Sequence, residues 1–416
     1  MTAPAIVILG AGPAGLAAAE AASRDGQAVL VLDENHGPGG QIWRGGPAHW
    51  NDARAAKLWR ALGARAHVKF LHGTRLVAQG APGTLLLEND EGARALAWQR
   101  LIICSGAREL LLPFPGWTLP GVTGAGGMQA LIKGGMPIAG KRVLVAGTGP
   151  LLLAVADTVQ RHGGQVVAIA EYRSGVELAR FGGQLALHHQ AKLAQALRLF
   201  ARLRRVPYLR GASVRTASGE QTLQAVVLKH GATVSEIGCD FLACGFGLLP
   251  ALETAGLFGC EIEQGRIRVG PDQRTSVDGV WAAGEATGIG GVDKALAEGR
   301  IAGLAALGQG ASAHERRALV QAHAFAQLLA QTFAPARALR DMCSPSTIVC
   351  RCEDVRAAQL APHASWRAAK LQTRVGMGPC QGRVCSAACG FLYGWEAAGA
   401  RPPLFPACAA TLASVS

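Results

Sequence analysis

The feature that most constrains the fold is a glycine-rich turn close to the N-terminus. A short apolar run over residues 5–9 leads into Gly-Ala-Gly-Pro-Ala-Gly at 10–15, and an Ala-rich segment follows at 16–23. A second apolar run over 28–32 ends in the acidic pair at 33–34. This order predicts a buried strand, a tight turn, a helix and a parallel strand that ends in an acid. That is the pattern of a dinucleotide-binding unit.

Each residue of this turn has its own predicted role. Gly10 permits the tight turn, Gly12 lets the backbone approach a pyrophosphate, and Gly15 lets the helix pack on the strand. The helix N-terminus then presents unpaired N–H groups to the phosphates. Asp33 stands where a carboxylate accepts hydrogen bonds from ribose hydroxyls. The residues predicted to bind the dinucleotide here are Gly10, Gly12, Pro13, Ala14, Gly15, Asp33 and Glu34.

A second unit with the same order of elements covers residues 142–171. Its turn carries Gly147 and Gly149, but Leu152 stands where the third glycine would be, so the helix and the strand pack less closely. Glu171 ends the second strand and favours NAD over NADP by repelling a 2′-phosphate. The sequence leaves open whether this unit binds NAD, ATP or no nucleotide.

Two further segments belong to the first dinucleotide-binding unit, and the second unit lies between them in the sequence. Residues 101–106 read as a strand that ends in Cys-Ser-Gly, and residues 279–285 as a strand that ends in Gly284 and Glu285. A glycine-rich run then opens a helix over 294–306, whose N-terminus could stabilise negative charge on a reduced flavin ring.

Composition excludes several other classes of protein. Glycine contributes 55 of the 416 residues, charged residues are 17%, and hydrophobic residues are 50%, which excludes disorder, collagen and a coiled coil. No apolar run approaches the length of about 18 residues that spans a bilayer. The net charge of +13 comes from scattered arginines with no basic helix interleaved with aromatics, so we expect no nucleic-acid partner. We expect a soluble cytoplasmic protein.

The cysteines point to a metal centre near the C-terminus. The chain has 11 cysteines, which in a cytoplasmic protein argues against a disulfide framework. A CxC pair and a Cx4C pair provide four thiolates: Cys350, Cys352, Cys380 and Cys385. Four thiolates suit a [2Fe–2S] cluster or a zinc ion, and we favour the cluster because zinc ribbons usually space their pairs as CxxC. Cys343 and Cys389 are candidate substitutes, and unligated cysteines remain an alternative.

The sequence resembles a family of flavoproteins. The two turns, Gly39-Gly40-Gln41 and Gly284-Glu285 are similar to two-dinucleotide-domain flavoproteins of the glutathione-reductase type. The segments 350–354, 373–385 and 401–403 resemble the alpha subunits of multi-subunit amine and imino-acid dehydrogenases. These include opine oxidases, hydrogen cyanide synthase and D-hydroxyproline dehydrogenase; a more distant relative is the alpha subunit of sarcosine oxidase. The cysteine segment is similar to the bacterioferritin-associated ferredoxin module.

The resemblance implies FAD in the first domain and a [2Fe–2S] cluster on the four cysteines. It implies a partner beta subunit whose own flavin oxidises the amine, and a small ferredoxin-like subunit is a further candidate partner. The chain departs from the family pattern in having Cys-Ser-Gly at 104–106 and a glutamate at 285. The residues assigned to the flavin side are Gly40, Gln41, Ser105, Gly106, Gly284, Glu285 and Val292, and those assigned to the second nucleotide site are Gly147, Gly149 and Glu171.

We therefore expect an α/β protein with two Rossmann-like domains and a small iron–sulfur module. The expected FAD domain covers 1–125 and 255–325, and the second dinucleotide domain covers 126–254. A linker over 326–345 leads to the iron–sulfur domain and C-terminal arm over 346–416. The expected function is electron transfer from a partner dehydrogenase that oxidises D-hydroxyproline, proline or an opine, with no catalytic residue on this chain. The alternatives are a stand-alone NAD(P)H-dependent flavin or ferredoxin-type reductase, and a redox-sensing scaffold.

Overall fold

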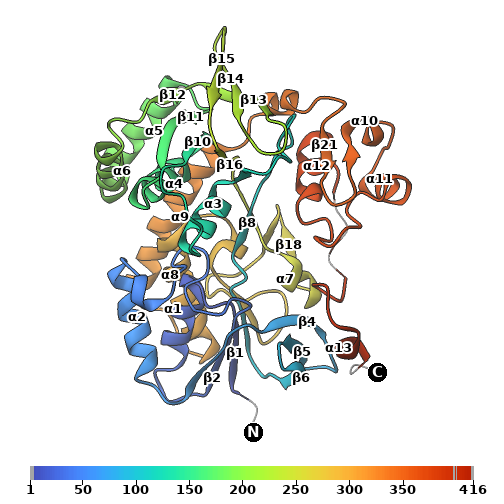
Figure 1. Ribbon diagram of the computed structural model, residues 1–416. Coiled ribbons are helices and arrows are strands. Elements are labelled where there is room, and N and C mark those ends of the chain that lie inside the picture. Colours follow the sequence, from blue (N-terminus) through green and yellow to red (C-terminus); the bar gives the residue numbers. More distant parts are fainter. Residues whose placement is uncertain (1–3, 397–398, 400, 414–416) are drawn as a thin grey trace. The chain divides into compact units, whose positions relative to one another are not determined.

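The computed structural model describes residues 4–396, 399 and 401–413 (Figure 1). The chain forms two compact units. The first comprises the residues up to 108, residues 249–327 and the C-terminal residues from 399. The second comprises residues 109–248 and 328–398, so that the division falls inside helix α9 (Ala313–Phe333).

A five-stranded parallel sheet forms the centre of the first unit. Its strands are, in order across the sheet, β20 (Val280–Ala282), β7 (Leu101–Ile103), β1 (Ile6–Leu9), β2 (Val29–Leu32) and β3 (Val68–Leu71). The central strands are continuous apolar runs that are buried along their whole length, as expected for a sheet covered on both faces. The strand at 101–103 and the strand at 280–282 therefore share one sheet with the N-terminal unit, across the intervening chain.

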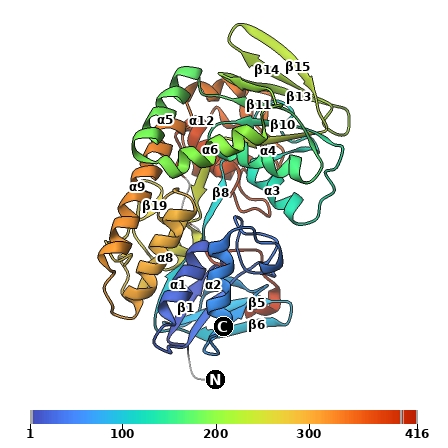
Figure 2. The same ribbon diagram turned by 90° about the vertical axis from the view of Figure 1, so that its left-hand side faces the viewer.

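Helices α1 (Pro13–Ala22), α2 (Ala53–Gly63) and α8 (Val292–Ala306) lie side by side in this unit (Figure 2). The closest approach is between α1 and α8, and it depends on glycine. A Cβ on Gly299 would stand 2.2 Å from the Ala14 carbonyl oxygen, so no side chain fits between the helices at this point.

The remaining elements of the first unit include a three-stranded antiparallel sheet. Its strands are β4 (Arg75–Gln79), β5 (Thr84–Asn89) and β6 (Gly92–Ala97). The C-terminal residues bind at this sheet, where the Leu404 N–H donates to the Val77 carbonyl at 2.8 Å. The other elements are η1 (Pro47–His49), α7 (Glu253–Leu257), β18 (Ile262–Glu263), β19 (Arg266–Ile267), η2 (Gly284–Thr287) and α13 (Ala409–Ala413).

A second five-stranded parallel sheet lies in the second unit. Its order is β12 (Tyr208–Arg210), β11 (Gln165–Glu171), β10 (Arg142–Gly147), β16 (Phe241–Gly245) and β9 (Val122–Gly124). Its helices are α3 (Ala125–Lys133), α4 (Leu151–Arg161), α5 (Gly175–His188) and α6 (Gln190–Arg202). An antiparallel sheet follows, with β13 (Ala212–Ser218), β14 (Ala225–His230) and β15 (Thr233–Gly238). The short strands β8 (Ala107–Glu109) and β17 (Leu248–Pro250) stand where the chain passes between units. The α/β architecture is confirmed.

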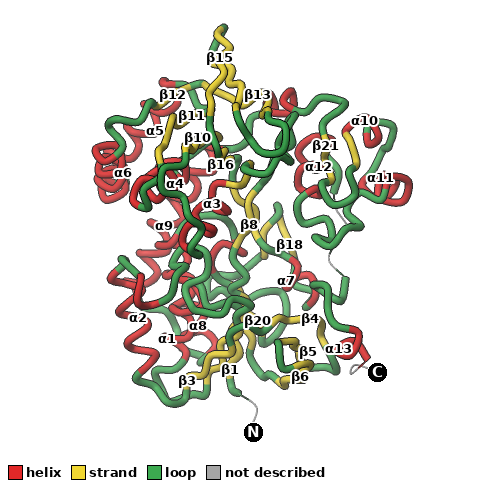
Figure 3. The backbone as a smooth tube through the Cα atoms, in the orientation of Figure 1, coloured by secondary structure: helices red, strands yellow, loops and turns green. Residues whose placement is uncertain are grey.

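The cysteine segment of the second unit consists of short elements joined by loops (Figure 3). Its elements are η3 (Arg337–Met342), β21 (Ile348–Cys350), β22 (Val355–Arg356), α10 (Ala357–Leu360), α11 (Trp366–Thr373) and α12 (Cys385–Tyr393). The Trp366 indole is buried at the centre of a small core. Gly376 and Gly382 line this ring, and a Cβ on Gly376 would stand 2.5 Å from the indole Cζ2. Glycine therefore lets the loop before α12 close over the indole. The segment expected to be a linker contains the end of α9 and η3.

Candidate functional site

The first glycine-rich turn has one face that is clear of side chains. A Cβ on Gly10 (φ +106°) would stand 2.3 Å from the Cys104 carbonyl oxygen, and one on Gly15 would stand 1.8 Å from the Gly10 carbonyl oxygen. Close packing therefore requires both glycines. Gly12 differs: among the described residues, only the Gly40 Cα comes within 4 Å of its hypothetical Cβ, at 3.9 Å. This is the face from which a pyrophosphate would approach the backbone.

The Asp33 carboxylate is buried at the end of β2 and faces the same turn. Its Oδ2 accepts a hydrogen bond from the Ala11 N–H at 2.5 Å, and its Oδ1 accepts from the backbone and side chain of Asn35, both at 2.7 Å. Because each carboxylate oxygen has two acceptor positions, Asp33 still has capacity for a ribose hydroxyl. Glu34 is exposed. Of the two adjacent acids, Asp33 is the one placed beside the turn.

The loop after β2 closes against the turn. The Gly39 N–H donates to the Ala11 carbonyl at 2.8 Å, and a Cβ on Gly40 (φ +57°) would stand 3.0 Å from the Gly12 Cα. Gln41 is exposed, and its side-chain oxygen accepts from the Arg44 guanidinium at 3.0 and 3.2 Å. Gly40 therefore contacts the turn directly, whereas Gln41 points to the surface.

Ser105 and Gly106 form the turn that follows β7. The Ser105 hydroxyl donates to the Ala251 carbonyl at 2.8 Å, and Gly106 adopts a φ of +73°. Cys104, directly before them, is buried, and burial raises the pKa of its thiol far above the usual range. A thiol held protonated in this way is a poor nucleophile, so its environment does not support thiol–disulfide exchange.

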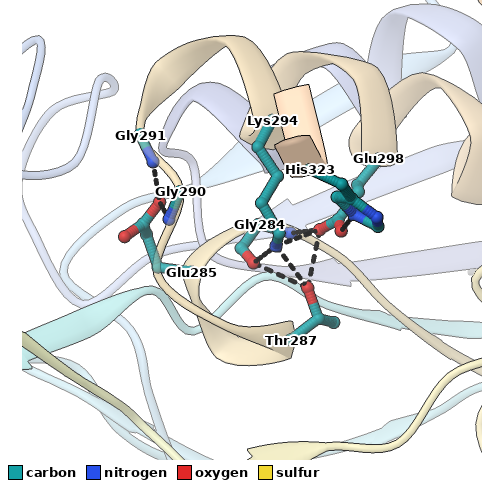
Figure 4. Close-up of polar contacts among 8 residues, drawn as sticks. All are labelled: Gly284, Glu285, Thr287, Gly290, Gly291, Lys294, Glu298 and His323. Carbon is teal, nitrogen blue, oxygen red and sulfur yellow. Dashed lines mark hydrogen bonds and ion pairs between the residues drawn. The ribbon is translucent and has the colours of Figure 1, made fainter. Parts of the chain in front are cut away.

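The strand β20 ends in a second turn that meets the N-terminus of α8 (Figure 4). The Glu285 Oε1 accepts hydrogen bonds from the Gly290 N–H at 3.2 Å and the Gly291 N–H at 2.7 Å. Burial raises the pKa of Glu285, and these two hydrogen bonds oppose the rise. Val292 is the first residue of α8. Glu285 therefore binds the glycine loop directly before α8, and both of its donors precede the first residue of that helix.

A buried charged network, which sequence reasoning missed, lies beneath the Gly284 turn (Figure 4). The Lys294 Nζ donates to the Gly284 carbonyl, the Thr287 hydroxyl and the Glu298 Oε2, each at 2.8 Å. Glu298 also accepts from the Gly284 N–H at 2.8 Å, and its Oε1 lies 2.9 Å from the His323 Nε2. Lys294 is 4% exposed and Glu298 is 1% exposed. All three ammonium hydrogens therefore have partners, as a buried lysine requires.

The second glycine-rich turn uses its acid in the same way as the first. Glu171 is 1% exposed, and its carboxylate accepts from the Gly149 N–H and the Arg173 N–H, both at 2.9 Å. Burial raises the pKa of Glu171, and the two backbone hydrogen bonds oppose that rise. Gly147 takes a φ of +142° against β16, and Leu152 is fully buried at the start of α4.

The outer face of this second turn is covered. The Phe333 Cγ stands 3.5 Å from the hypothetical Cβ of Gly149. The Phe333 ring also packs edge-on against Phe181, with ring centroids 4.9 Å apart, and Arg173 donates to the Ala334 carbonyl. A pyrophosphate at Gly149 would therefore compete with the end of α9.

The four candidate ligand cysteines lie close together. Cys385 lies close enough to Cys350 to shift its pKa, Cys380 acts in the same way on Cys352, and Cys380 also acts on Cys385. The neighbouring Cys385 thiol lowers the pKa of Cys350 to about 5, and backbone N–H groups, including that of Gly376, act in the same direction. Segments about thirty residues apart in sequence thus place four sulfurs in one region.

In the cysteine segment, a glycine again lets two parts of the backbone come close together. A Cβ on Gly378 would stand 2.2 Å from the Cys352 Cβ. Of the two candidate substitutes, Cys389 is buried and Cys343 is half-buried.

In the part of the chain that the structure describes, no three His, Cys, Asp or Glu side chains are arranged to hold a single metal ion. Nor does any helix among those residues have the length and apolar character needed to cross a membrane.

Comparison with known proteins identifies the relatives of this chain. Residues 4–299 match the family model described as pyridine nucleotide-disulphide oxidoreductase. An opine oxidase subunit from Rhizobium meliloti (strain 1021) is 33% identical, over 91% of this chain and 90% of its own length. The HcnB subunit of hydrogen cyanide synthase from Pseudomonas aeruginosa is 31% identical, over 92% and 91%.

Solved structures share the fold. L-proline dehydrogenase from P. horikoshii superposes with a TM-score of 0.70 at 17% identity, over 99% of this chain and 79% of that one. Thioredoxin reductase from Lactococcus lactis gives a TM-score of 0.56 at 20% identity, over 73% of this chain and 98% of that one. Because this family model covers most of the chain, the protein belongs to the pyridine nucleotide-disulphide oxidoreductase family of flavin-dependent enzymes.

Proposed function

We propose that this chain is the FAD- and [2Fe–2S]-containing electron-transfer subunit of a hetero-oligomeric amino- or imino-acid dehydrogenase. It would relay electrons from a partner flavoprotein subunit to an acceptor. The relatives named as subunits of opine oxidase and of hydrogen cyanide synthase support a partner chain, because they match over almost the whole length. The proposed substrate class is D-hydroxyproline, proline or an opine, oxidised on the partner.

The first unit supplies the features that an FAD site needs. The clear face at Gly12 would receive the pyrophosphate, and Asp33 would accept from the ribose. Gly284 and Glu285, ahead of the helix that begins at Val292, would face the flavin end. The chain's own contribution is to position the cofactor and to tune its electrostatics.

The observation that carries the electron-transfer role is the proximity of the four cysteine thiols within one small segment. Four thiolates are a ligand set of a [2Fe–2S] cluster, and their CxC and Cx4C spacing favours such a cluster over one zinc ion. Backbone N–H groups directed at Cys350 would stabilise negative charge on its sulfur. A bound cluster would supply one-electron transfer, complementing the two-electron chemistry of a flavin.

The test is a visible spectrum with flavin, iron, sulfide and zinc assays on protein purified without oxygen. We expect one FAD and about two irons and two sulfides per chain. Cys352→Ser should lose the iron and keep the flavin, whereas Cys408→Ser, at an exposed cysteine of the other unit, should keep both. Flavin without iron or sulfide in the wild-type protein would contradict the cluster.

A stand-alone NAD(P)H-dependent reductase is the second candidate, favoured by the glycine turn and terminal acid of the second unit. Anaerobic mixing separates the two functions. The reductase would bleach its flavin rapidly with NADH alone, whereas the electron-transfer subunit would bleach only when the co-expressed partner and its substrate are present.

A further inference from the structure

A cavity of about 220 Å³ lies within the second unit, outside both glycine-rich turns. Its walls come from the segment after residue 108, from the ends of β9 and β16, and from the loop that carries two of the candidate ligand cysteines. Phe114, Trp117 and Phe246 supply buried aromatic surface. The cavity thus combines aromatic and aliphatic surface with a polar part of similar extent, as small-molecule sites with a few placed polar groups do.

The carboxylate of Glu109 lines this cavity and is held rigidly. Its Oε1 accepts from the Gly126 N–H at 2.7 Å and its Oε2 from the Gly127 N–H at 2.8 Å, at the start of α3. These are backbone hydrogen bonds, and no lysine, arginine or histidine side chain in the described part of the chain forms an ion pair with Glu109. The Ala125 N–H also stabilises the charged carboxylate, which leaves it one acceptor position, and burial raises the pKa of this carboxyl. A cationic group in the cavity would relieve the cost of the buried charge.

A cation lines the same cavity. The Arg351 guanidinium carbon stands 5.5 Å from the centroid of the Trp117 ring. The Trp117 Nε1–H donates to the Ile348 carbonyl at 2.6 Å, which fixes the ring on which the guanidinium lies. Among the described residues no carboxylate forms an ion pair with Arg351, so its five donors are available to a ligand.

We propose that this cavity binds the zwitterion of a small amino or imino acid, with the ammonium group at Glu109 and the carboxylate at Arg351. Two charges of opposite sign in one small cavity select a ligand that carries both. The volume fits a small ring, since an apolar cavity of about 150 Å³ accepts benzene. The site would let this subunit sense the substrate class or a product of its complex, and its occupancy does not depend on the proposed electron transfer.

Three matched probes test the charge requirement by calorimetry on the full-length protein. L-proline carries both charges, pyrrolidine lacks the carboxylate, and cyclopentanecarboxylate lacks the ammonium, while all three share one ring size. We expect proline to bind at least about tenfold more tightly than either singly charged probe, the usual effect of losing one charge-assisted hydrogen bond. Equal affinities for the three probes, or no binding of proline at tens of millimolar, would overturn the proposal.

Two substitutions assign the charges to residues. Glu109→Gln should weaken proline binding without weakening cyclopentanecarboxylate binding, whereas Arg351→Gln should weaken proline binding without weakening pyrrolidine binding, because each substitution removes a charge that repels the second probe. The second variant keeps the test valid if the first disturbs α3. Circular dichroism and the flavin spectrum show that each variant is folded, and Arg356→Gln, at an exposed arginine of the same segment, is the control. Variants that weaken all three probes equally would also contradict the assignment.

Discussion

The ring of Phe333 covers Gly149 in the second glycine-rich turn, whereas the equivalent Gly12 of the first turn meets, among the residues that the structure describes, only the Cα of Gly40. The two turns share a backbone pattern and a terminal acid that hydrogen-bonds back to the turn. The two turns differ in whether a side chain covers their outer face. Since a pyrophosphate approaches a dinucleotide fold at this glycine, the difference predicts that the first site binds its nucleotide tightly and the second does so weakly.

Removing the covering ring should open the second turn. We expect Phe333→Ala to raise the affinity for NAD or ATP by about tenfold, equivalent to about 1.4 kcal/mol. Isothermal titration with each nucleotide measures the change. Val320→Ala, at an exposed position of the same helix, serves as the control and should leave the affinity unchanged. Unaltered nucleotide affinity in Phe333→Ala would show that the ring does not limit access.

Substitutions in the first turn should separate binding from folding. Gly12→Ala adds a methyl group only to the clear face, so the fold should persist while the Kd for FAD rises by about tenfold or more. Gly15→Ala places a methyl group 1.8 Å from a backbone oxygen, so it should prevent folding. Gly63→Ala, at the end of α2 with open space around it, is the matched control. Flavin titration and circular dichroism distinguish the three outcomes, and full FAD affinity in Gly12→Ala would place the pyrophosphate elsewhere.

The strands and turns could be predicted from sequence because their signals are local. Glycines at fixed spacing after an apolar run have few alternatives, and the helix predicted over 294–306 begins only two residues earlier, at Val292. The four cysteines could also be selected by spacing. Their proximity could not, because it depends on how the loop before α12 folds back towards β21 and the turn after it.

The Lys294 network and the Phe333 cover were not predicted, for related physical reasons. A lysine and a glutamate four residues apart on a helix usually form an exposed pair, and here the Gly284–Thr287 turn and His323 of α9 cover them. The contact between Phe333 and Gly149 joins segments far apart in sequence and leaves no periodic signal. Similarly, the contact of Glu285 with Gly290 and Gly291 depends on the conformation of the loop before α8.

Breaking the buried network should strongly destabilise the first unit. Lys294→Met leaves the Glu298 carboxylate buried without its closest cation, which costs about 3–5 kcal/mol. We expect a clearly lower urea midpoint for the unfolding of this unit. Tryptophan fluorescence measures this unfolding transition. Lys57→Met, at an exposed lysine of α2, should leave the midpoint within error. A Lys294→Met midpoint equal to that of the wild type would mean that Glu298 is neutral in the folded protein.

The pH dependence of stability should report on Glu285. Burial raises the pKa of this carboxyl above 4.5, so above that raised pKa the folded protein carries a buried charge that costs stability. As pH falls through the raised pKa, the folded state binds a proton before the unfolded state does, and wild-type stability increases until about pH 4.5. Glu285→Gln keeps an oxygen that can accept from Gly290 and Gly291 and never carries the charge.

The variant should therefore have a higher melting temperature than the wild type at pH 7 to 8, and the difference should shrink as the pH is lowered towards 4.5. Thermal melts of both proteins across this range measure it. Glu263→Gln, at an exposed carboxylate of the same unit, should show no such convergence. A difference of constant size, or one that grows at low pH, would mean that Glu285 stays ionised throughout. In that case its hydrogen bonds to the loop before α8 would outweigh the desolvation that raises its pKa.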